Sequence, residues 1–251
     1  MTEMKRHFII PDMQVPYEDR AAVAAVASCI ADWKNPGDTV TTIGDEMDFD
    51  MLGRWVKGSD KEWSRRIGAD RDRTVQVLKD LQVDNMIRSN HTDRVFKTLA
   101  DRAPGFLGLP ELELPNFFRL DEVGAKFHQK AFTIAPGWIA LHGDESGLSQ
   151  LAGRTAANLA IKTGTNVVCG HTHRAGLSAT TYGIYGRVNA ERWGLEVGNL
   201  MDMKSSGAAY SKVHNWQQAF GVLYQNGRSV TPCLIPIVNK RFVFEGIEYR
   251  L

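Results

Sequence analysis

The sequence HFIIPDMQVP, residues 7–16, sets an aspartate directly behind a short apolar run. Residues 7–10 have the composition of a buried strand, and Pro11 ends it because proline cannot donate a ladder hydrogen bond. Asp12 therefore follows the carboxyl end of a strand, which is where ligands bind in open α/β sheets. Taken alone, an aspartate in this position is more often a turn or cap residue than a ligand, so the rest of the chain decides between the two.

The segments that follow alternate between two periodicities. Residues 18–33 have apolar side chains at a helical spacing, and the turn at residues 35–38 separates them from a second apolar strand at residues 39–43. Residues 61–82 predict an arginine-rich helix, and residues 84–88 predict a third strand. Strands that alternate with helices are typical of a layered α/β domain.

The second half of the chain is mostly β, after a loop-rich section punctuated by glycine and proline. Strands are predicted at residues 126–134, 137–142, 166–169, 176–182, 193–198, 218–225 and 229–246. A helix is predicted at residues 147–162, with Gly164 placed where a glycine often ends a helix. Because no repeat, low-complexity tract or linker interrupts the pattern, we expect a single domain over residues 1–251.

Composition excludes several classes of protein. A hydrophobic share of 43% is enough for a core of ordinary size, and a net charge of +1 gives no overall field toward nucleic acid or a membrane. No apolar run reaches the roughly 18 residues of a membrane span, and no signal sequence is recognisable. Cys29, Cys169 and Cys233 lack the spacing of a disulfide framework. We expect a reduced, cytoplasmic protein of enzyme size.

Polar residues able to bind metal gather behind the apolar runs. They are Asp12, the pair Asp45 and Asp48, the pair Asn90 and His91, His142, and the pair His171 and His173. Oxygen and imidazole donors of this kind suit Mn, Fe or Zn. Even two of these aspartates, the asparagine and three of the histidines are more ligands than one divalent ion needs, and they suit two ions that share a bridging carboxylate.

The order of these motifs resembles that of the calcineurin-like metallophosphoesterases, whose pattern is D-x-H, G-D-x-x-D, G-N-H-D/E, H and G-H-x-H. Here the pattern is matched in order by Asp12-Met13-Gln14, Gly44-Asp45-Glu46-Met47-Asp48, Ser89-Asn90-His91-Thr92-Asp93, His142-Gly143 and Gly170-His171-Thr172-His173. The resemblance runs from residue 7 to about residue 200 and looks most like a bacteriophage-encoded member, which would act in the host cytoplasm. It implies a four-layer α/β-β/α sandwich, with two mixed sheets flanked by helices.

The resemblance also implies a role for each motif residue. The metal ligands would be Asp12, Gln14 and His173 at a first site, Asn90, His142 and His171 at a second site, and Asp45 as the bridge between the two. His91 would act as the general acid, and Asp48 would orient its imidazole and keep it charged. Two divalent ions are implied as cofactors, with Mn²⁺ preferred and Mg²⁺, Fe, Zn²⁺ or Ni²⁺ as alternatives.

Several positions depart from the family pattern. Gln14 replaces the usual histidine, so it is either a weak ligand that favours harder ions such as Mn²⁺ or Mg²⁺, or a hydrogen-bond partner that does not touch metal. Ser89 replaces glycine, and Thr92 replaces an acidic residue whose orienting hydrogen bond is either lost or moved to Asp93. Phe49 stands where some relatives have an arginine on the phosphate, which argues against a protein phosphatase.

These residues support one leading hypothesis and two alternatives. The leading one is a metal-dependent phosphoesterase that hydrolyses phosphodiesters, such as small or cyclic nucleotides, by a metal-bridging hydroxide with His91 as general acid. Its partner would be a small phosphoester or nucleotide substrate, with nucleic acid not favoured and no membrane expected. The first alternative is a DNA or RNA exonuclease of the same superfamily. The second, motivated by Gln14 and Thr92, is a metal-degenerate binding protein without turnover.

Other charged and aromatic residues have two interpretations each. The basic series either tracks a phosphate backbone or forms a solvated helix face, and interleaved acidic residues favour the second; the series is Lys57, Lys61, Arg65, Arg66, Arg71 and Arg73. Arg174 either reaches a substrate phosphate or, as we favour, is structural. Structural or surface positions are expected for His7, His128 and His214, and core positions for Trp63, Trp193 and Trp216.

Overall fold

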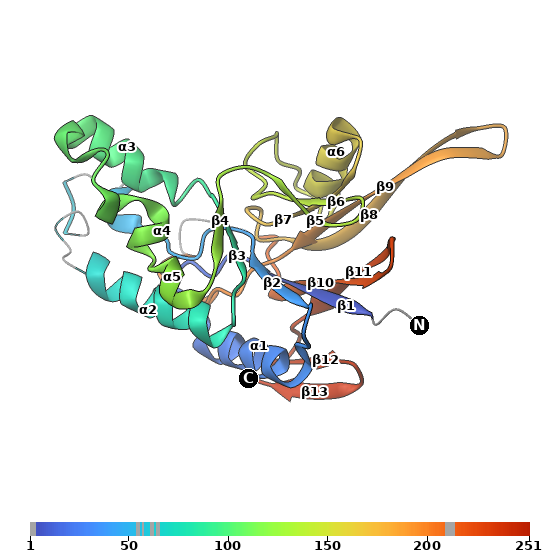
Figure 1. Ribbon diagram of the computed structural model, residues 1–251, viewed down its shortest axis with the longest axis horizontal. Coiled ribbons are helices and arrows are strands. Elements are labelled where there is room, and N and C mark those ends of the chain that lie inside the picture. The colour runs from blue at the N-terminus through green and yellow to red at the C-terminus, as the bar shows by residue number, and fades with distance from the viewer. Residues whose placement is uncertain (1–3, 54–55, 57, 61–62, 64–65, 209–213) are drawn as a thin grey trace.

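The computed structural model describes residues 4–53, 56, 58–60, 63, 66–208 and 214–251 and contains two large β-sheets (Figure 1). The first sheet consists, in spatial order, of β11 (Ser229–Pro236), β10 (Ala219–Asn226), β1 (Lys5–Ile10), β2 (Thr39–Thr42), β3 (Asn85–Ile87) and β4 (Lys126–His128). The second consists of β5 (Phe132–Ala135), β6 (Trp138–Ala140), β7 (Asn166–Cys169), β9 (Arg187–Val197) and β8 (Ala175–Ile184). A separate hairpin pairs β12 (Arg241–Phe244) with β13 (Ile247–Arg250).

Helices connect and cover these sheets. The α-helices are α1 (Arg20–Trp33), α2 (Ile67–Asp80), α3 (Asp93–Arg102), α4 (Leu114–Phe117), α5 (Leu120–Val123) and α6 (Arg154–Thr163). Short 3₁₀ turns are η1 (Asp50–Leu52), η3 (Pro104–Phe106) and η4 (Pro110–Leu112). The start of α1 illustrates how local sequence sets an element, because the Asp19 carboxylate accepts hydrogen bonds from the Ala21 and Ala22 amides at 3.1 and 3.2 Å.

Both sheets are mixed, with a parallel centre. In the first sheet β1, β2, β3 and β4 are parallel to one another. β10 is antiparallel to β1, and β11 is antiparallel to β10. In the second sheet β6, β7 and β9 are parallel, while β5 and β8 are antiparallel to their neighbours. The carboxyl ends of the parallel strands therefore open at a shared edge within each sheet, which is the place where the polar motifs follow them.

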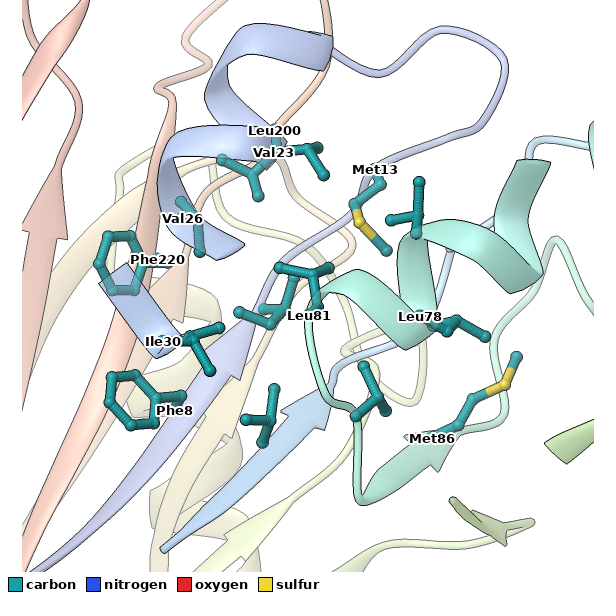
Figure 2. Close-up of a cluster of buried hydrophobic side chains, with 14 of the residues drawn as sticks. Phe8, Met13, Val23, Val26, Ile30, Leu78, Leu81, Met86, Leu200 and Phe220 are labelled. Carbon is teal, nitrogen blue, oxygen red and sulfur yellow. The ribbon is translucent and has the colours of Figure 1, made fainter. Parts of the chain in front are cut away.

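Alternation along β1 shows why the layers stack as they do. Phe8 and Ile10 belong to the core beneath α1 and α2, whereas Ile9 between them belongs to the core between the two sheets. Figure 2 shows the first of these cores, where Val26 of α1 and Leu81, next to α2, lie among side chains from the strands. Each side of the first sheet is thus apolar, as expected for a buried parallel sheet.

The second sheet is covered on its far side by α6. Ala156, Leu159 and Ala160 of this helix share a buried cluster with Val167 and Cys169 of β7. In Figure 1, α6 lies above the second sheet and α1 lies below the first. The order of layers is therefore helix, sheet, sheet, helix, which is the four-layer α/β-β/α arrangement predicted from the sequence. Across the described residues, no helix has the length and apolar character needed to cross a membrane.

Several predicted boundaries were wrong. The strand predicted at residues 126–134 is divided between β4 in the first sheet and β5 in the second, because the turn between them carries the chain from one sheet to the other. The strand predicted at residues 229–246 is likewise divided into β11 and β12. The helix predicted at residues 147–162 begins only at Arg154, since Gly153 has a left-handed φ of 77°. The section read as loop contains α3, α4 and α5. Part of the predicted helix 61–82 lies outside the described residues.

Candidate metal centre

Five strands deliver the predicted site residues to one place. Asp12 follows β1, Asp45 follows β2, and Asn90 follows β3, all from the first sheet. His142 follows β6, and the pair His171 and His173 follows β7, both in the second sheet. The site therefore lies where the carboxyl ends of both parallel centres meet.

Within the described chain, the acidic and histidine side chains form two groups that could each hold a metal ion. One group is Asp12, Asp45 and His173, and the other is Asp45, His142 and His171. In each group the potential ligand atoms lie within 4.8 Å of one another. Asp45 belongs to both, which is the arrangement expected of a carboxylate that bridges two ions.

Several potential ligand atoms at the site lack a hydrogen-bond partner among the described residues. Asp12 Oδ2, Gln14 Oε1, His171 Nδ1 and His173 Nδ1 are buried and have no hydrogen-bond partner in the described part of the chain. Buried polar atoms are normally paired, so a cluster of unpaired donors and acceptors requires an explanation. Oxygen and imidazole atoms gathered in this way are ligands that divalent ions such as Mn²⁺ or Zn²⁺ accept.

Asp45 is the electrostatic centre of the site. Its carboxylate is 1% exposed, accepts a hydrogen bond from the Gln14 amide at 3.1 Å and lies 3.4 Å from His142 Nε2. Burial by itself would raise the pKa of Asp45, but His91 and His142 hold that pKa well below its usual range. The group is therefore an anion at neutral pH, as a bridging ligand has to be.

In the second group, hydrogen bonds to both ring nitrogens orient His142. The Nδ1–H of His142 donates to the Ile43 carbonyl at 2.9 Å, and His142 Nε2 lies 2.8 Å from Asn90 Oδ1. A backbone carbonyl on one ring nitrogen is the usual way in which a protein aims the other nitrogen at a metal. Burial opposes a charge on this ring, yet Asp45 raises the pKa of His142 to about 10.

Gln14 reaches the first group. Its Nε2 lies 3.1 Å from Asp45 Oδ2 and 3.4 Å from His173 Nε2, so the amide sits between two candidate ligands. The side chain is 2% exposed, and its Oε1 is one of the unpaired atoms. This position allows the amide oxygen to serve as a ligand, and the assignment stays a prediction.

The backbone at the site is conformationally unusual. Gln14, Asp45, His171 and His173 have φ values of 57, 54, 66 and 56°, in the left-handed region that non-glycine residues seldom adopt. Each such residue costs on the order of 1 kcal/mol or more, and clusters of them mark functional sites. The neighbouring backbone must also come close, because a Cβ added at Gly170 would lie 2.4 Å from Asp12 Oδ1.

Two residues that depart from the family pattern, Ser89 and Thr92, bond to each other in the loop that carries Asn90 and His91. The Ser89 amide donates to Thr92 Oγ1 at 2.9 Å, the Thr92 amide donates to Ser89 Oγ at 3.2 Å, and the Thr92 hydroxyl donates to the Ser89 carbonyl at 2.8 Å. Both side chains are fully buried. Asp93 instead binds Arg88 at 2.5 Å, so it does not take over the orienting role considered for an acidic residue.

His91 and Asp48 meet through a different atom from the one predicted. His91 Nδ1 lies 2.7 Å from the backbone carbonyl of Asp48 and 3.9 Å from its carboxylate. Arg94 completes the group, with Nη2 2.9 Å from His91 Nε2 and Nη1 3.3 Å from Asp48 Oδ1. Sequence reasoning missed Arg94, although its position three residues after His91, one helical turn away, was the available signal.

A second residue missed by sequence reasoning is Glu196 of β9. Its Oε1 accepts from the Thr155 and Ala156 amides at 2.6 and 3.2 Å, where α6 begins, and its Oε2 accepts from the Thr172 hydroxyl at 3.0 Å. Thr172 stands between the two histidines of the first and second groups. A glutamate flanked by buried Leu195 and Val197 was the signal that could have revealed this residue, because fully buried carboxylates are rare.

The remaining predicted residues divide into two sets. Arg71 pairs with the exposed Asp72, as predicted for a solvated helix face, whereas Arg66 and Arg73 pair with the largely buried Asp50 and Glu18 outside the helix; Lys57, Lys61 and Arg65 lie outside the described residues. Arg174 is buried and donates to Gln150 Oε1 at 2.6 Å, consistent with a structural role.

The predictions for the lone histidines and tryptophans were partly wrong. His7 bonds to Thr39 and Gln225, and His128 to Asn85, as structural residues do. Trp63 is 79% exposed and so is not a core residue. Trp216 is only partly buried and packs edge-on against His173 at a ring distance of 4.6 Å, and the exposed His214 stacks on Trp216 at 4.7 Å. These two rings therefore lie beside the metal centre, while Trp193 packs against the core between the sheets.

A cavity of about 420 Å³ opens next to both groups. Its walls include Gln14, Asn90, His91, His171, Asp48 and Arg94. This volume is in the range that small-molecule ligands occupy. The site thus combines a candidate two-ion centre with a pocket of small-molecule size.

Fold and site together define a class: a four-layer α/β protein with a candidate metal centre at the carboxyl ends of its strands. The chain is 36% identical to "Gene 54 protein" of Mycobacterium phage D29, over 96% of this chain and 97% of the relative. It is 35% identical to "Gene 54 protein" of Mycobacterium phage L5, with the same coverage. The chain belongs to this family of mycobacteriophage Gene 54 proteins, in agreement with the phage origin predicted from the sequence.

Two other comparisons complete the picture. No family model matches the sequence. Among solved structures, the chain is similar to wild-type Vps29 from Entamoeba histolytica complexed with Zn²⁺, with 15% identity, a TM-score of 0.45 and 98% of each chain covered. It is also similar to Vacuolar Protein Sorting 29 from Cryptosporidium parvum, with 12% identity, a TM-score of 0.47 and 99% of each chain covered.

Proposed function

We propose that this chain is a calcineurin-like metallophosphoesterase that hydrolyses small phosphodiesters, such as small or cyclic nucleotides. The observation that carries the proposal is the sharing of Asp45 between two groups of potential ligands beside the cavity. A single structural metal would need only one of these groups. Two adjacent sites with a common carboxylate are typical of phosphoryl-transfer centres.

The chain's own residues would divide the work as follows. Asp12, Gln14 and His173 would hold the first ion, Asn90, His142 and His171 the second, and Asp45 both. Two divalent ions, with Mn²⁺ preferred, would supply charge for the phosphoryl oxygens and lower the pKa of the attacking water. Ligands that include only two carboxylates, Asp12 and Asp45, leave the centre positively charged, which favours an anionic substrate.

His91 would act on the leaving group. It lines the cavity, and its Nε2 lies 3.7 Å from Asp45 Oδ2, next to the candidate centre. When the phosphorus–oxygen bond breaks, the leaving oxygen needs a proton, and an imidazole is the side chain best suited to give one near neutral pH. The Asp48 carbonyl fixes the ring through Nδ1, so Nε2, which lies 2.9 Å from Arg94 Nη2, is the nitrogen that would act on the substrate.

The shape of the cavity supports a small substrate. Its volume accommodates a nucleotide but not a duplex, and the described arginines of the basic series are ion-paired with carboxylates and do not line it. A nuclease would need a basic track for the phosphate backbone, with affinity that falls steeply with salt.

The direct test is an assay of metal-stripped protein with bis(p-nitrophenyl) phosphate, adding Mn²⁺, Mg²⁺, Zn²⁺ or Ni²⁺ in turn. Turnover that appears with metal and is lost in Asp45→Asn is the expected result. Asp80→Asn, an exposed carboxylate of α2, is the matched control and should retain full activity. Equal activity in Asp45→Asn and the control would refute a two-ion centre bridged by Asp45.

The role of His91 has its own test. His91→Ala should slow the hydrolysis of alkyl esters, whose leaving groups are poor, far more than that of nitrophenyl esters, which leave without a proton. Equal losses on both substrates would show that His91 stabilises charge and does not donate a proton.

A further inference from the structure

Arg94 occupies an unusual position for a cation. It lies in the first turn of α3, lines the cavity beside the candidate metal centre, and its side chain is 29% exposed. Among the described residues that line this cavity, it is the only lysine or arginine. A guanidinium remains charged at any working pH, so Arg94 contributes a permanent positive charge to the cavity.

One nitrogen of the guanidinium anchors the side chain. Nη1 donates to the Asp48 carbonyl at 2.7 Å and lies 3.3 Å from Asp48 Oδ1. These contacts use the backbone and the carboxylate of one residue, and they fix the plane of the guanidinium. The anchor is charge-assisted, which makes it stronger than a neutral hydrogen bond.

The other terminal nitrogen of Arg94, Nη2, faces His91. Nη2 lies 2.9 Å from His91 Nε2, and a guanidinium can only donate, so Nε2 accepts this hydrogen bond. His91 Nδ1 faces the carbonyl of Asp48 and therefore carries the hydrogen. The neutral imidazole is a modest acceptor for a charged donor, whereas an anionic oxygen would be a much stronger one.

Phe49 stands where some calcineurin-like phosphoesterases have an arginine that binds the phosphate, and here that position is part of the core. Phe49 is 1% exposed and packs against Phe117 and Phe118 at ring distances of 5.7 and 6.1 Å. Its ring is part of the core, so it contributes nothing to a phosphate. The side-chain cation beside the described cavity lies instead on α3, as Arg94.

We propose that Arg94 is a substrate-binding residue whose Nη2 contacts a non-bridging oxygen of the substrate phosphoryl group. The proposal rests on the function proposed above and adds the residue that recognises the anion. A phosphoryl oxygen at this point takes the Nη2 hydrogen bond away from His91, which leaves Nε2 of His91 free to take up a proton from water and then give it to the leaving-group oxygen. The same event therefore binds the anion and frees the ring nitrogen through which His91 would pass a proton.

Arginine suits this task better than lysine. The planar fork anchors one nitrogen on Asp48 and still presents the second to the pocket, whereas an ammonium is a single point charge. Arg94→Lys is therefore expected to recover only part of the function, while Arg94→Gln removes the charge and keeps a similar length. Lys97→Gln is the matched control, because Lys97 lies on the same helix, is 73% exposed and does not line the cavity.

The experiment uses the full chain loaded with Mn²⁺. Inorganic phosphate is titrated in a calorimeter and as an inhibitor of bis(p-nitrophenyl) phosphate hydrolysis. A hydrogen bond to a charged group contributes enough that Arg94→Gln should weaken phosphate binding roughly 10- to 100-fold and raise KM similarly. Arg94→Lys should fall between this variant and the wild type, and Lys97→Gln should match the wild type. Mn²⁺ affinity should be unchanged in all three variants, which separates anion binding from a structural role.

The outcomes distinguish this inference from the proposed function. Phosphate binding in Arg94→Gln within twofold of the wild type, in an active enzyme, overturns the inference and leaves the function intact. Loss of Mn²⁺ affinity in Arg94→Gln also overturns it, because Arg94 would then support the metal centre. A wild-type protein without turnover, whose phosphate binding still depends on Arg94, supports the inference and refutes the function.

Discussion

Glu196 connects the fold to the candidate metal centre, so its removal should be felt in both. The carboxylate is fully buried and satisfies two amides at the start of α6 and the hydroxyl of Thr172. Glu196→Ala leaves these three groups buried without an acceptor. Each costs about 1–3 kcal/mol when unpaired. Because the end of a helix can relax toward water, we expect a total loss of about 3–5 kcal/mol in the free energy of unfolding.

Urea unfolding of the metal-free protein measures this loss through the midpoint and the slope of the transition. Glu196→Gln keeps the size and one acceptor oxygen, so it should lose about 1–2 kcal/mol. Glu191→Ala, an exposed glutamate on the same strand, should change the stability by less than about 0.5 kcal/mol. A loss below about 1 kcal/mol in Glu196→Ala would refute the reasoning, because the three groups would then have other partners.

The same variant should also weaken metal binding. Thr172 lies between His171 and His173, and its hydroxyl is held by Glu196 Oε2. Removal of a residue that orients ligands typically costs 10- to 100-fold in metal affinity. Calorimetry with Mn²⁺ on folded Glu196→Gln tests this, since that variant keeps enough stability to be studied. Unchanged affinity would show that the loop holds its shape without Glu196.

Three further predictions concern the loops. Gln14→His should tighten the first site and shift preference from Mn²⁺ toward Zn²⁺ in metal titrations, and an unchanged order of affinities would show that Gln14 does not touch metal. Gly170→Ala places a Cβ 2.4 Å from Asp12 Oδ1 and 2.5 Å from Ile43 Cγ2, so metal affinity should fall at least tenfold; retention of affinity would mean that the loop moves easily. Thr92→Val removes the hydroxyl that binds Ser89 and should cost about 1–3 kcal/mol in urea unfolding, with no loss expected if water replaces it.

The sequence contained enough to predict the layers and the place of the site, because both depend on local patterns. The run at residues 166–169 gave the bounds of β7, and each polar motif directly followed an apolar run. Prediction failed where the tertiary structure decides. The split between β4 and β5 depends on which sheet each half joins, and no local pattern records that choice.

Hydrogen bonds between residues far apart in the chain could not be predicted from the sequence either. Glu196 lies 24 positions from Thr172 and 41 from Thr155, so only the folded chain shows that one carboxylate serves both. The sequence showed Ser89 and Thr92 as two separate departures from the family pattern, and the structure shows that they bond to each other. A motif comparison treats each position independently, so it cannot show that two substituted residues interact with each other.

The left-handed residues at the site raise the question of what holds them there without metal. Backbone hydrogen bonds between the loops hold them in place. The Gln14 backbone amide donates to the Asp45 carbonyl at 2.8 Å, and the Gln217 backbone amide donates to the His173 carbonyl at 3.0 Å. The Leu200 amide likewise donates to the Asp12 carbonyl at 2.9 Å. Ligands fixed in this way lose little freedom when ions bind, so more of the binding energy appears as affinity. For this reason we expect changes that loosen the loops, such as those at Glu196 or Gly170, to lower metal affinity even though every ligand remains in the chain.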